Sequence, residues 1–238
     1  MNLRQDMHVH STFSDGRDAI EDNVARAEAL GLTELGCVDH VRVSTDWLPG
    51  YVAAVQRIRA TTDVRLTCSI EAKLLDTTGA LDLPPDIDGV EAIFAADHQV
   101  PLDDGPNHPR DVRERLERGD LTAQEVLEAI ITSTARALDR PEPVVIAHFF
   151  SVLPKIGLDE AEVPEDLLQY LAAETARTGQ TIEISERWRC PNARTLRPFV
   201  DSGVPIVVST DSHRSDTIGQ YEYCTGVVAE LGLPGGGA

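Results

Sequence analysis

The sequence has 238 residues, 42% of them apolar, which suits one large globular domain better than two small ones. Its 40 acidic residues outnumber its 21 basic residues, and the net charge of −19 disfavours long nucleic acids as partners. No run of about eighteen apolar residues occurs, so we expect neither a transmembrane helix nor a membrane partner.

The chain alternates between short apolar or β-rich runs and amphipathic stretches of helical period. The predicted strands span residues 3–9, 34–38, 64–70, 90–95, 144–147, 181–185 and 206–209. The predicted helices span residues 19–30, 50–60, 122–138, 165–178, 192–201 and 219–231, with a shorter one at 111–117. We expect residues 1–232 to form a single domain and the glycine-rich end, 233–238, to be disordered.

Seven β-then-α units predict a parallel sheet with helices outside it, either open or closed into a barrel. No G-x-G-x-x-G motif follows the first strand, so a dinucleotide-binding fold has no support. The positions of the polar residues decide between the open and the closed sheet.

The N-terminus and the cysteines indicate the compartment. The stretch MNLRQDMHVH lacks the apolar segment of a signal peptide, which predicts a cytoplasmic protein. The cysteines form no C-x-x-C pair, and Cys37 and Cys68 lie in apolar runs. We therefore expect core thiols in a reducing compartment.

Six of the seven histidines stand where predicted strands end. They are His8, His10, His40, His98, His148 and His213. Acidic residues accompany them, with Glu71 after the third strand and Asp211 after the seventh. His108 lies beside a proline in a loop and is interpreted as a surface residue.

Each of these residues alone is weak evidence, because a lone strand-end histidine is more often an ordinary polar residue than a ligand. Together they indicate a metal site, since the ends of parallel barrel strands converge on one face. Alternate residues of a strand point the same way, so His8 and His10 share a side, as do Asp211 and His213. Imidazole and carboxylate ligands without cysteine suit zinc, manganese or iron.

These stretches resemble the PHP (polymerase and histidinol phosphatase) superfamily. The matching segments are "HVHSTFSDG", "VDH", the glutamate of "SIEAK", "AADH", "VIAHF" and "STDSH", in that order from residue 8 to residue 213. The resemblance implies a distorted (β/α)7 barrel with a metal site at the C-terminal ends of the strands, which agrees with the seven units counted above.

The resemblance also implies a centre of three divalent transition metals. By this resemblance, the first metal would be held by His8, His10, Glu71 and Asp211, and the second by Glu71, His98 and His148. The third would be held by Asp15, His40 and His213. Glu71 would bridge the first two metals, and we expect Glu71 and Asp211 to act in catalysis.

The reaction expected of such a centre is hydrolysis of a small phosphomonoester by a metal-bridging hydroxide. Histidinol phosphate and nucleotide-type phosphates are both candidate substrates. The basic residues predicted to contact the phosphate are Arg187, Arg189, Arg214 and Lys73. Trp188 has two equal interpretations, one against a ring of the substrate and one in packing.

Two alternatives remain open at this point. An amidohydrolase-type enzyme also begins with H-x-H, but it usually has eight strands and lacks the "SDG" and "VDH" elements. A non-catalytic accessory PHP module is disfavoured by the complete ligand set. The oligomeric state cannot be inferred from the sequence.

Overall fold

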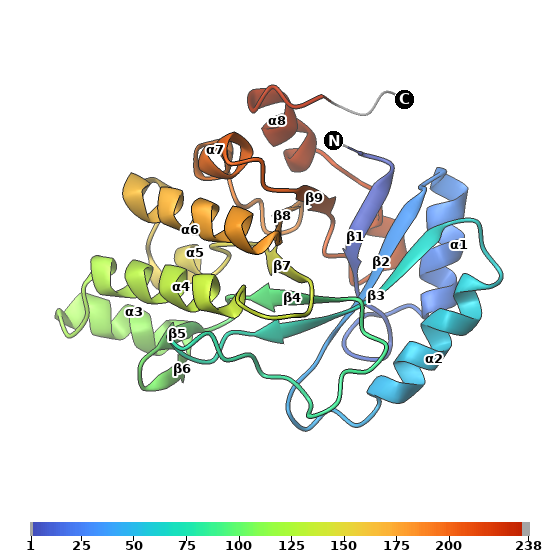
Figure 1. Cartoon of the computed structure of the whole chain (residues 1–238), viewed down its shortest axis with the longest axis horizontal. Helices are drawn as coiled ribbons and strands as arrows, with labels where there is room; N and C mark the ends of the chain where they lie inside the picture. The colour runs from blue at the N-terminus through green and yellow to red at the C-terminus, as the bar shows by residue number, and fades with distance from the viewer. Residues whose placement is uncertain (1, 235–238) are drawn as a thin grey trace.

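The computed structural model describes residues 2–234 and contains a seven-stranded parallel sheet in the order β1-β2-β3-β4-β7-β8-β9 (Figure 1). The strands are β1 (Gln5–Val9), β2 (Glu34–His40), β3 (Arg65–Lys73), β4 (Ala92–Ala96), β7 (Val144–Ala147), β8 (Thr181–Ser185) and β9 (Ile206–Ser209). Of the tail predicted to be disordered, Leu233 packs against the core, and residues 235–238 lie outside the described range.

The sheet closes almost completely on itself where β9 returns to β1. Val9 forms a parallel bridge with Ser212, and the His10 amide donates to the Ser212 carbonyl at 2.8 Å. The buried Asp6 carboxylate reinforces this seam by accepting hydrogen bonds from the amide (2.9 Å) and the hydroxyl (2.6 Å) of Thr210. The predicted distorted (β/α)7 barrel is thereby confirmed.

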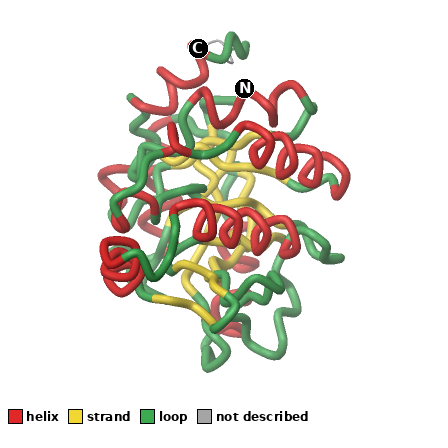
Figure 2. The backbone as a smooth tube through the Cα atoms, turned by 90° about the vertical axis from the view of Figure 1, so that its left-hand side faces the viewer, coloured by secondary structure: helices red, strands yellow, loops and turns green. Residues whose placement is uncertain are grey.

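Helices surround the strands, as Figure 2 shows from the side. They are α1 (Ile20–Leu30), α2 (Leu48–Arg59), α3 (Pro109–Arg118), α4 (Ala123–Ala137), α5 (Leu153–Ile156), α6 (Glu165–Thr178), α7 (Ala193–Asp201) and α8 (Tyr223–Glu230). Local chemistry sets several ends: α1 stops at Gly31, which takes the left-handed conformation (φ 68°), and α4 begins with a Thr122–Glu125 capping box.

Two apolar layers result from the alternation of side chains along the strands. On β4, Ile93 and Ala95 face the helices and join the large outer core. Phe94 and Ala96 belong to a smaller cluster inside the barrel. Because Glu71 pairs with Phe94 in the register of β3 and β4, the inner cluster forms the floor beneath Glu71.

The structure adds elements that the sequence did not predict. The segment after β4, where the sequence predicted no strand, contains the hairpin β5 (Val100–Leu102) and β6 (Gly105–Asn107). Each of these strands has three residues, with a proline in the middle, and such prolines are ordinarily evidence against strands. The four-residue helix α5 was also missed, because it is too short to show a period.

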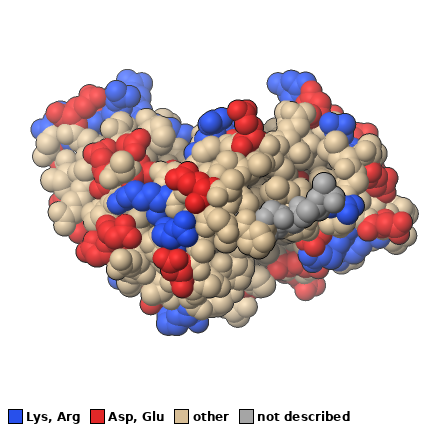
Figure 3. All heavy atoms as spheres, turned by 90° about the horizontal axis from the view of Figure 1, so that it is seen from above, with Lys and Arg blue, Asp and Glu red and all other residues tan. Residues whose placement is uncertain are grey.

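Acidic and basic side chains intermingle on the face seen in Figure 3, so the excess negative charge does not form one large patch there. All four cysteines are buried and unpaired. Among the described residues, no helix has the length and apolar character needed to cross a membrane.

Candidate metal centre

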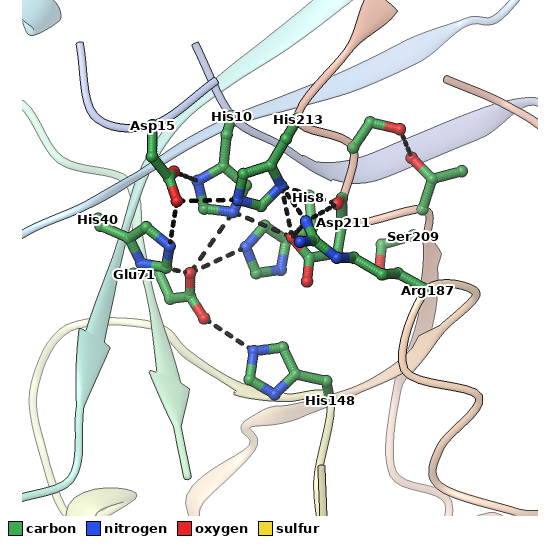
Figure 4. Close-up of polar contacts among 12 residues, drawn as sticks. His8, His10, Asp15, His40, Glu71, His148, Arg187, Ser209, Asp211 and His213 are labelled. Carbon is green, nitrogen blue, oxygen red and sulfur yellow. Dashed lines mark hydrogen bonds and ion pairs between the residues drawn. The ribbon is translucent and has the colours of Figure 1, made fainter. Parts of the chain in front are cut away.

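The nine residues predicted as metal ligands come together at the C-terminal ends of the barrel strands. Figure 4 labels all of them except His98. They are His8, His10, Asp15, His40, Glu71, His98, His148, Asp211 and His213. Eight of them form three overlapping groups in which the nitrogen and oxygen atoms lie within 4.8 Å of one another. A pocket of about 740 Å³ reaches this cluster from the surface.

Glu71 lies at the centre of the cluster, and its two carboxylate oxygens face different histidines. Its Oε1 atom is 2.8 Å from His148 Nε2 and 3.0 Å from His98 Nε2. Its Oε2 atom is 2.8 Å from His40 Nδ1 and 3.4 Å from His8 Nε2. A carboxylate whose oxygens point in two directions is suited to bridge two cations.

The first strand and its continuation contribute two buried histidines, His8 and His10. Their rings point the same way because they alternate along β1 and its continuation. His10 Nε2 lies 3.1 Å from Asp211 Oδ1, and His8, His10 and Asp211 form one of the three groups. His8 also lies against the ring of Phe94, with 4.7 Å between ring centroids, so the inner apolar cluster fixes it from below.

A second group lies nearer the solvent. Asp15 Oδ2 is 3.2 Å from His213 Nε2 and 3.5 Å from His40 Nε2. The loop that carries Asp15 folds tightly back under β1, since a Cβ atom on Gly16 would lie 2.6 Å from the backbone of His10. Glycine is therefore required in the "SDG" turn for Asp15 to reach this position.

Several buried polar atoms of the cluster have no hydrogen-bond partner among the described residues. They are His8 Nε2, both ring nitrogens of His10, Glu71 Oε2 and Asp211 Oδ1. Buried polar atoms are normally satisfied, so a group of unsatisfied lone pairs that face one another calls for a ligand. The donor set of imidazole nitrogens and carboxylate oxygens fits a divalent transition metal.

The charges of the cluster also suit cations. Burial alone would raise the pKa of Glu71, but the surrounding histidines hold it well below its usual range. Burial would likewise raise the pKa of Asp211, but the nearby His10 and His8 side chains lower it. In return Glu71 and Asp15 raise the pKa of His40 to about 10, against the opposing effect of burial. A metal cation would neutralise the same carboxylates without protons on the histidines.

Two of the nine residues have unusual backbone conformations. His148 and Asp211 have φ angles of 27° and 49°, in a region that non-glycine residues rarely occupy. Neighbouring groups hold them there: the Cys190 thiol donates to the His148 carbonyl at 3.2 Å, and Arg187 Nη1 donates to the Asp211 carbonyl at 3.2 Å. Strained residues of this kind are concentrated at functional sites.

Glu183 was not predicted, yet it supports two residues of the cluster. This fully buried side chain lies on β8 and accepts from His8 Nδ1 at 2.8 Å and from the His148 amide at 2.5 Å. The Ser209 hydroxyl donates to it at 2.5 Å. With Nδ1 of His8 engaged, Nε2 is directed at the centre of the cluster.

Two of the four predicted phosphate contacts line the pocket. Arg187 contacts His213 and lies 3.8 Å from Asp211 Oδ1, at the edge of the cluster. Lys73, at the end of β3, lies 3.5 Å from the Asp82 carboxylate. Both cations can therefore approach an anion bound at the cluster.

The other two predicted contacts lie elsewhere. Arg214 pairs with Asp216 and lines a neighbouring cavity, and the Arg189 guanidinium lies 5.2 Å from the centroid of the Tyr223 ring. Neither residue lines the pocket that reaches the cluster. The sequence could show that both residues follow strand ends, but it could not show whether they line the pocket, because the direction of a loop side chain is set by its tertiary neighbours.

The family model that matches this chain is the PHP domain, over residues 6–187. The chain belongs to the PHP domain family. The match covers more than half of the chain and includes seven of the nine clustered residues. Membership of the PHP family also decides against the amidohydrolase alternative.

Known proteins similar to this PHP domain share its fold at low sequence identity. A protein of Clostridium acetobutylicum named "probable phosphatase" is 22% identical over 96% of this chain and 86% of its own length. The histidinol phosphate phosphatase of Lactococcus lactis, solved with zinc, L-histidinol and phosphate, is 17% identical with a TM-score of 0.70, covering 99% of this chain and 96% of the other. A Listeria monocytogenes protein assigned as a histidinol phosphatase is 14% identical with a TM-score of 0.60, covering 93% and 99%.

Further residues of this PHP domain contact the cluster without having been predicted. The Trp188 indole donates to Asp211 Oδ2 at 2.6 Å, and Lys155 Nζ lies 4.1 Å above the Trp188 ring. Asp39 and Asp97 directly precede His40 and His98, and this adjacency in the sequence could have indicated that they lie near the cluster. Asp39 accepts from the amide (3.0 Å) and hydroxyl (2.7 Å) of Ser11 and so holds the loop that follows His10.

Proposed function

We propose that this protein is a metal-dependent phosphatase that hydrolyses small phosphomonoesters. The observation that carries the proposal is the cluster around Glu71, in which buried imidazole and carboxylate atoms face one another without partners. Membership of the PHP family and the phosphatase names of similar proteins support it.

We propose that the cluster holds three divalent metals, with zinc, manganese and iron as candidates. In this assignment His8, His10, Glu71 and Asp211 hold the first, Glu71, His98 and His148 the second, and Asp15, His40 and His213 the third. Two of the groups of nearby ligand atoms support the first and third sites. The contacts of Glu71 Oε1 with His98 and His148 support the second. Bound divalent metals lower the pKa of coordinated water toward neutrality and neutralise phosphate oxygens.

The chain's own cations would orient the phosphate. Arg187 would grip phosphate oxygens, because its guanidinium borders the cluster next to His213 and Asp211. Lys73 and Lys155, the two lysines of the sequence, both line the same pocket. In a chain with a net charge of −19, this gathering of cations favours an anionic substrate.

The proposed substrate is a small phosphomonoester, either histidinol phosphate or a nucleotide-type phosphate. The Lactococcus lactis enzyme, solved with L-histidinol and phosphate, supports the first possibility. The pocket, of about 740 Å³, has room for a leaving group beside the phosphate. The cytoplasmic location stays a prediction.

The test is a phosphate-release assay on metal-free protein reconstituted with zinc, manganese or iron. A panel of phosphomonoesters should include histidinol phosphate and nucleoside monophosphates. We expect release only with added metal, and its loss in the His8→Ala/His10→Ala variant. Failure to release phosphate from any ester, in protein that has bound metal, would favour the non-catalytic accessory alternative.

A further inference from the structure

A second groove adjoins the pocket that reaches the metal cluster. It has a volume of about 550 Å³ and is lined by His98, Gln99, His108, Arg110, Arg113 and Lys155, together with Pro109. We call it the basic groove. His98, Gln99 and Lys155 also line the main pocket, so the two cavities share a wall. His98 belongs to the cluster, with its Nε2 atom 3.0 Å from Glu71, so the groove borders the cluster directly.

The basic groove differs from its surroundings in charge. No aspartate or glutamate lines it, although the chain has 40 acidic residues. The cavity beside α4, in contrast, carries both signs and includes Asp103, Glu125 and Arg115. A cavity whose ionisable side chains are all cationic or imidazole, in a protein with a net charge of −19, selects for an anion.

The helix α3 holds two of the cations in place. His108 caps this helix by accepting the Arg110 amide at Nδ1 (3.2 Å), and α3 packs against α5, which carries Lys155. Arg110 and Arg113 are one turn apart and therefore lie on the same side of α3. His108, interpreted from the sequence as a surface residue, therefore lines the groove.

Ion pairs within α3 leave both arginines able to bind an anion. Arg110 pairs with Glu114 at 3.1 Å and Arg113 with Glu117 at 3.0 Å, both through Nε on the exposed surface of α3. Exposed pairs of this spacing contribute only about 0.3–0.5 kcal/mol. Among the described residues, the terminal nitrogens of both guanidinium groups make no hydrogen bond, so they can donate to an anion as well.

We propose that the basic groove binds a second anionic group carried by the leaving group of the substrate. The substrate class is then a phosphoester that bears another phosphate or a carboxylate. The inference rests on the proposed phosphatase function for the position of the first phosphate. The second group would extend past His98 and Lys155 toward Arg110 and Arg113.

The test compares ligands that differ only in the second anion. Alkyl monophosphonates and α,ω-alkane bisphosphonates of three to six carbons are titrated calorimetrically into the metal-loaded protein. The corresponding alkanediol monophosphates and bisphosphates are assayed for phosphate release. We expect the best bisphosphonate to bind about 10-fold more tightly than its monophosphonate, which corresponds to one charge-assisted contact.

The variant Arg110→Gln/Arg113→Gln should abolish this preference while leaving monophosphonate binding unchanged. The matched control Arg57→Gln/Arg177→Gln removes two exposed, ion-paired arginines elsewhere and should keep the preference. Equal binding of both ligand types, or a preference that survives in the groove variant, would overturn the inference. Phosphonate discrimination without turnover of any ester would instead leave the groove in place and contradict the proposed function.

Discussion

Glu71 connects more members of the cluster than any other described residue does, because its two oxygens approach histidines from β1, β2, β4 and β7. Glu71→Gln keeps the shape of the side chain and removes its charge. We expect this variant to bind fewer metals than the wild type and to lose at least about 100-fold in kcat. Full metal content with near-normal turnover, measured by elemental analysis and steady-state assay, would show that Glu71 bridges nothing.

Glu183 acts on the cluster through His8 and the His148 amide. Glu183→Gln should weaken metal binding about 10- to 100-fold, because a carboxylate that accepts hydrogen bonds on both oxygens is replaced by a neutral amide that can accept on only one. Metal competition with a chromophoric chelator measures this without an activity assay. Glu34→Gln, at the N-terminal end of β2 and away from the cluster, is the control and should bind metal normally. Unchanged affinity in Glu183→Gln would assign this residue to packing alone.

Arg187 and Arg189 lie in one loop but have different surroundings, and this difference makes a paired test. Arg187→Ala should lower kcat/KM by roughly 10- to 1000-fold with metals still bound, since a charge-assisted phosphate contact is lost in the transition state. Arg189→Ala should change kcat/KM little, because its guanidinium lies over Tyr223, away from the pocket. Similar small effects at both positions would mean that the metals and lysines, and not Arg187, bind the phosphate.

Among the secondary-structure elements, the sequence predicted most of the repeated β/α units. The bounds of β7, β8 and β9 agree with the predicted strands, since each is an apolar run that stops at polar residues. Eight of the nine clustered residues could be predicted because they stand at strand ends in chain order, and Asp15, in the turn after the first strand, was predicted from the family resemblance. Glu183, Trp188 and Lys155 could not, because their roles depend on contacts between separate β/α units that no local pattern records.

The closure of the barrel between β1 and β9 can be tested by mutation. Asp6 accepts three hydrogen bonds there, two from Thr210 and one from the Gly219 amide at 2.9 Å. Asp6→Ala leaves these donors unsatisfied and should reduce the free energy of unfolding by about 2–4 kcal/mol. Urea denaturation measures the loss, with the exposed Asp63→Ala as control. A change below about 0.5 kcal/mol would mean that the seam does not depend on Asp6.

At the scale of the whole molecule, burial determines how the cysteines behave. All four thiols are buried, and burial raises the pKa of Cys37, Cys68, Cys190 and Cys224. The folded protein should therefore show no rapid reaction with a disulfide reagent at neutral pH, and four thiols should react after denaturation. A rapidly titrating thiol in the native protein would contradict the packing of the core.

At the scale of the whole molecule, an acidic chain encloses a cluster of ligand atoms that we expect to hold several metal ions. The most direct test is the number of divalent metals bound per chain after reconstitution of metal-free protein with zinc, manganese or iron and removal of the excess. We expect about three per chain, from the three groups of ligand atoms. A protein that never retains more than one ion under any of these conditions would contradict a centre of several metals.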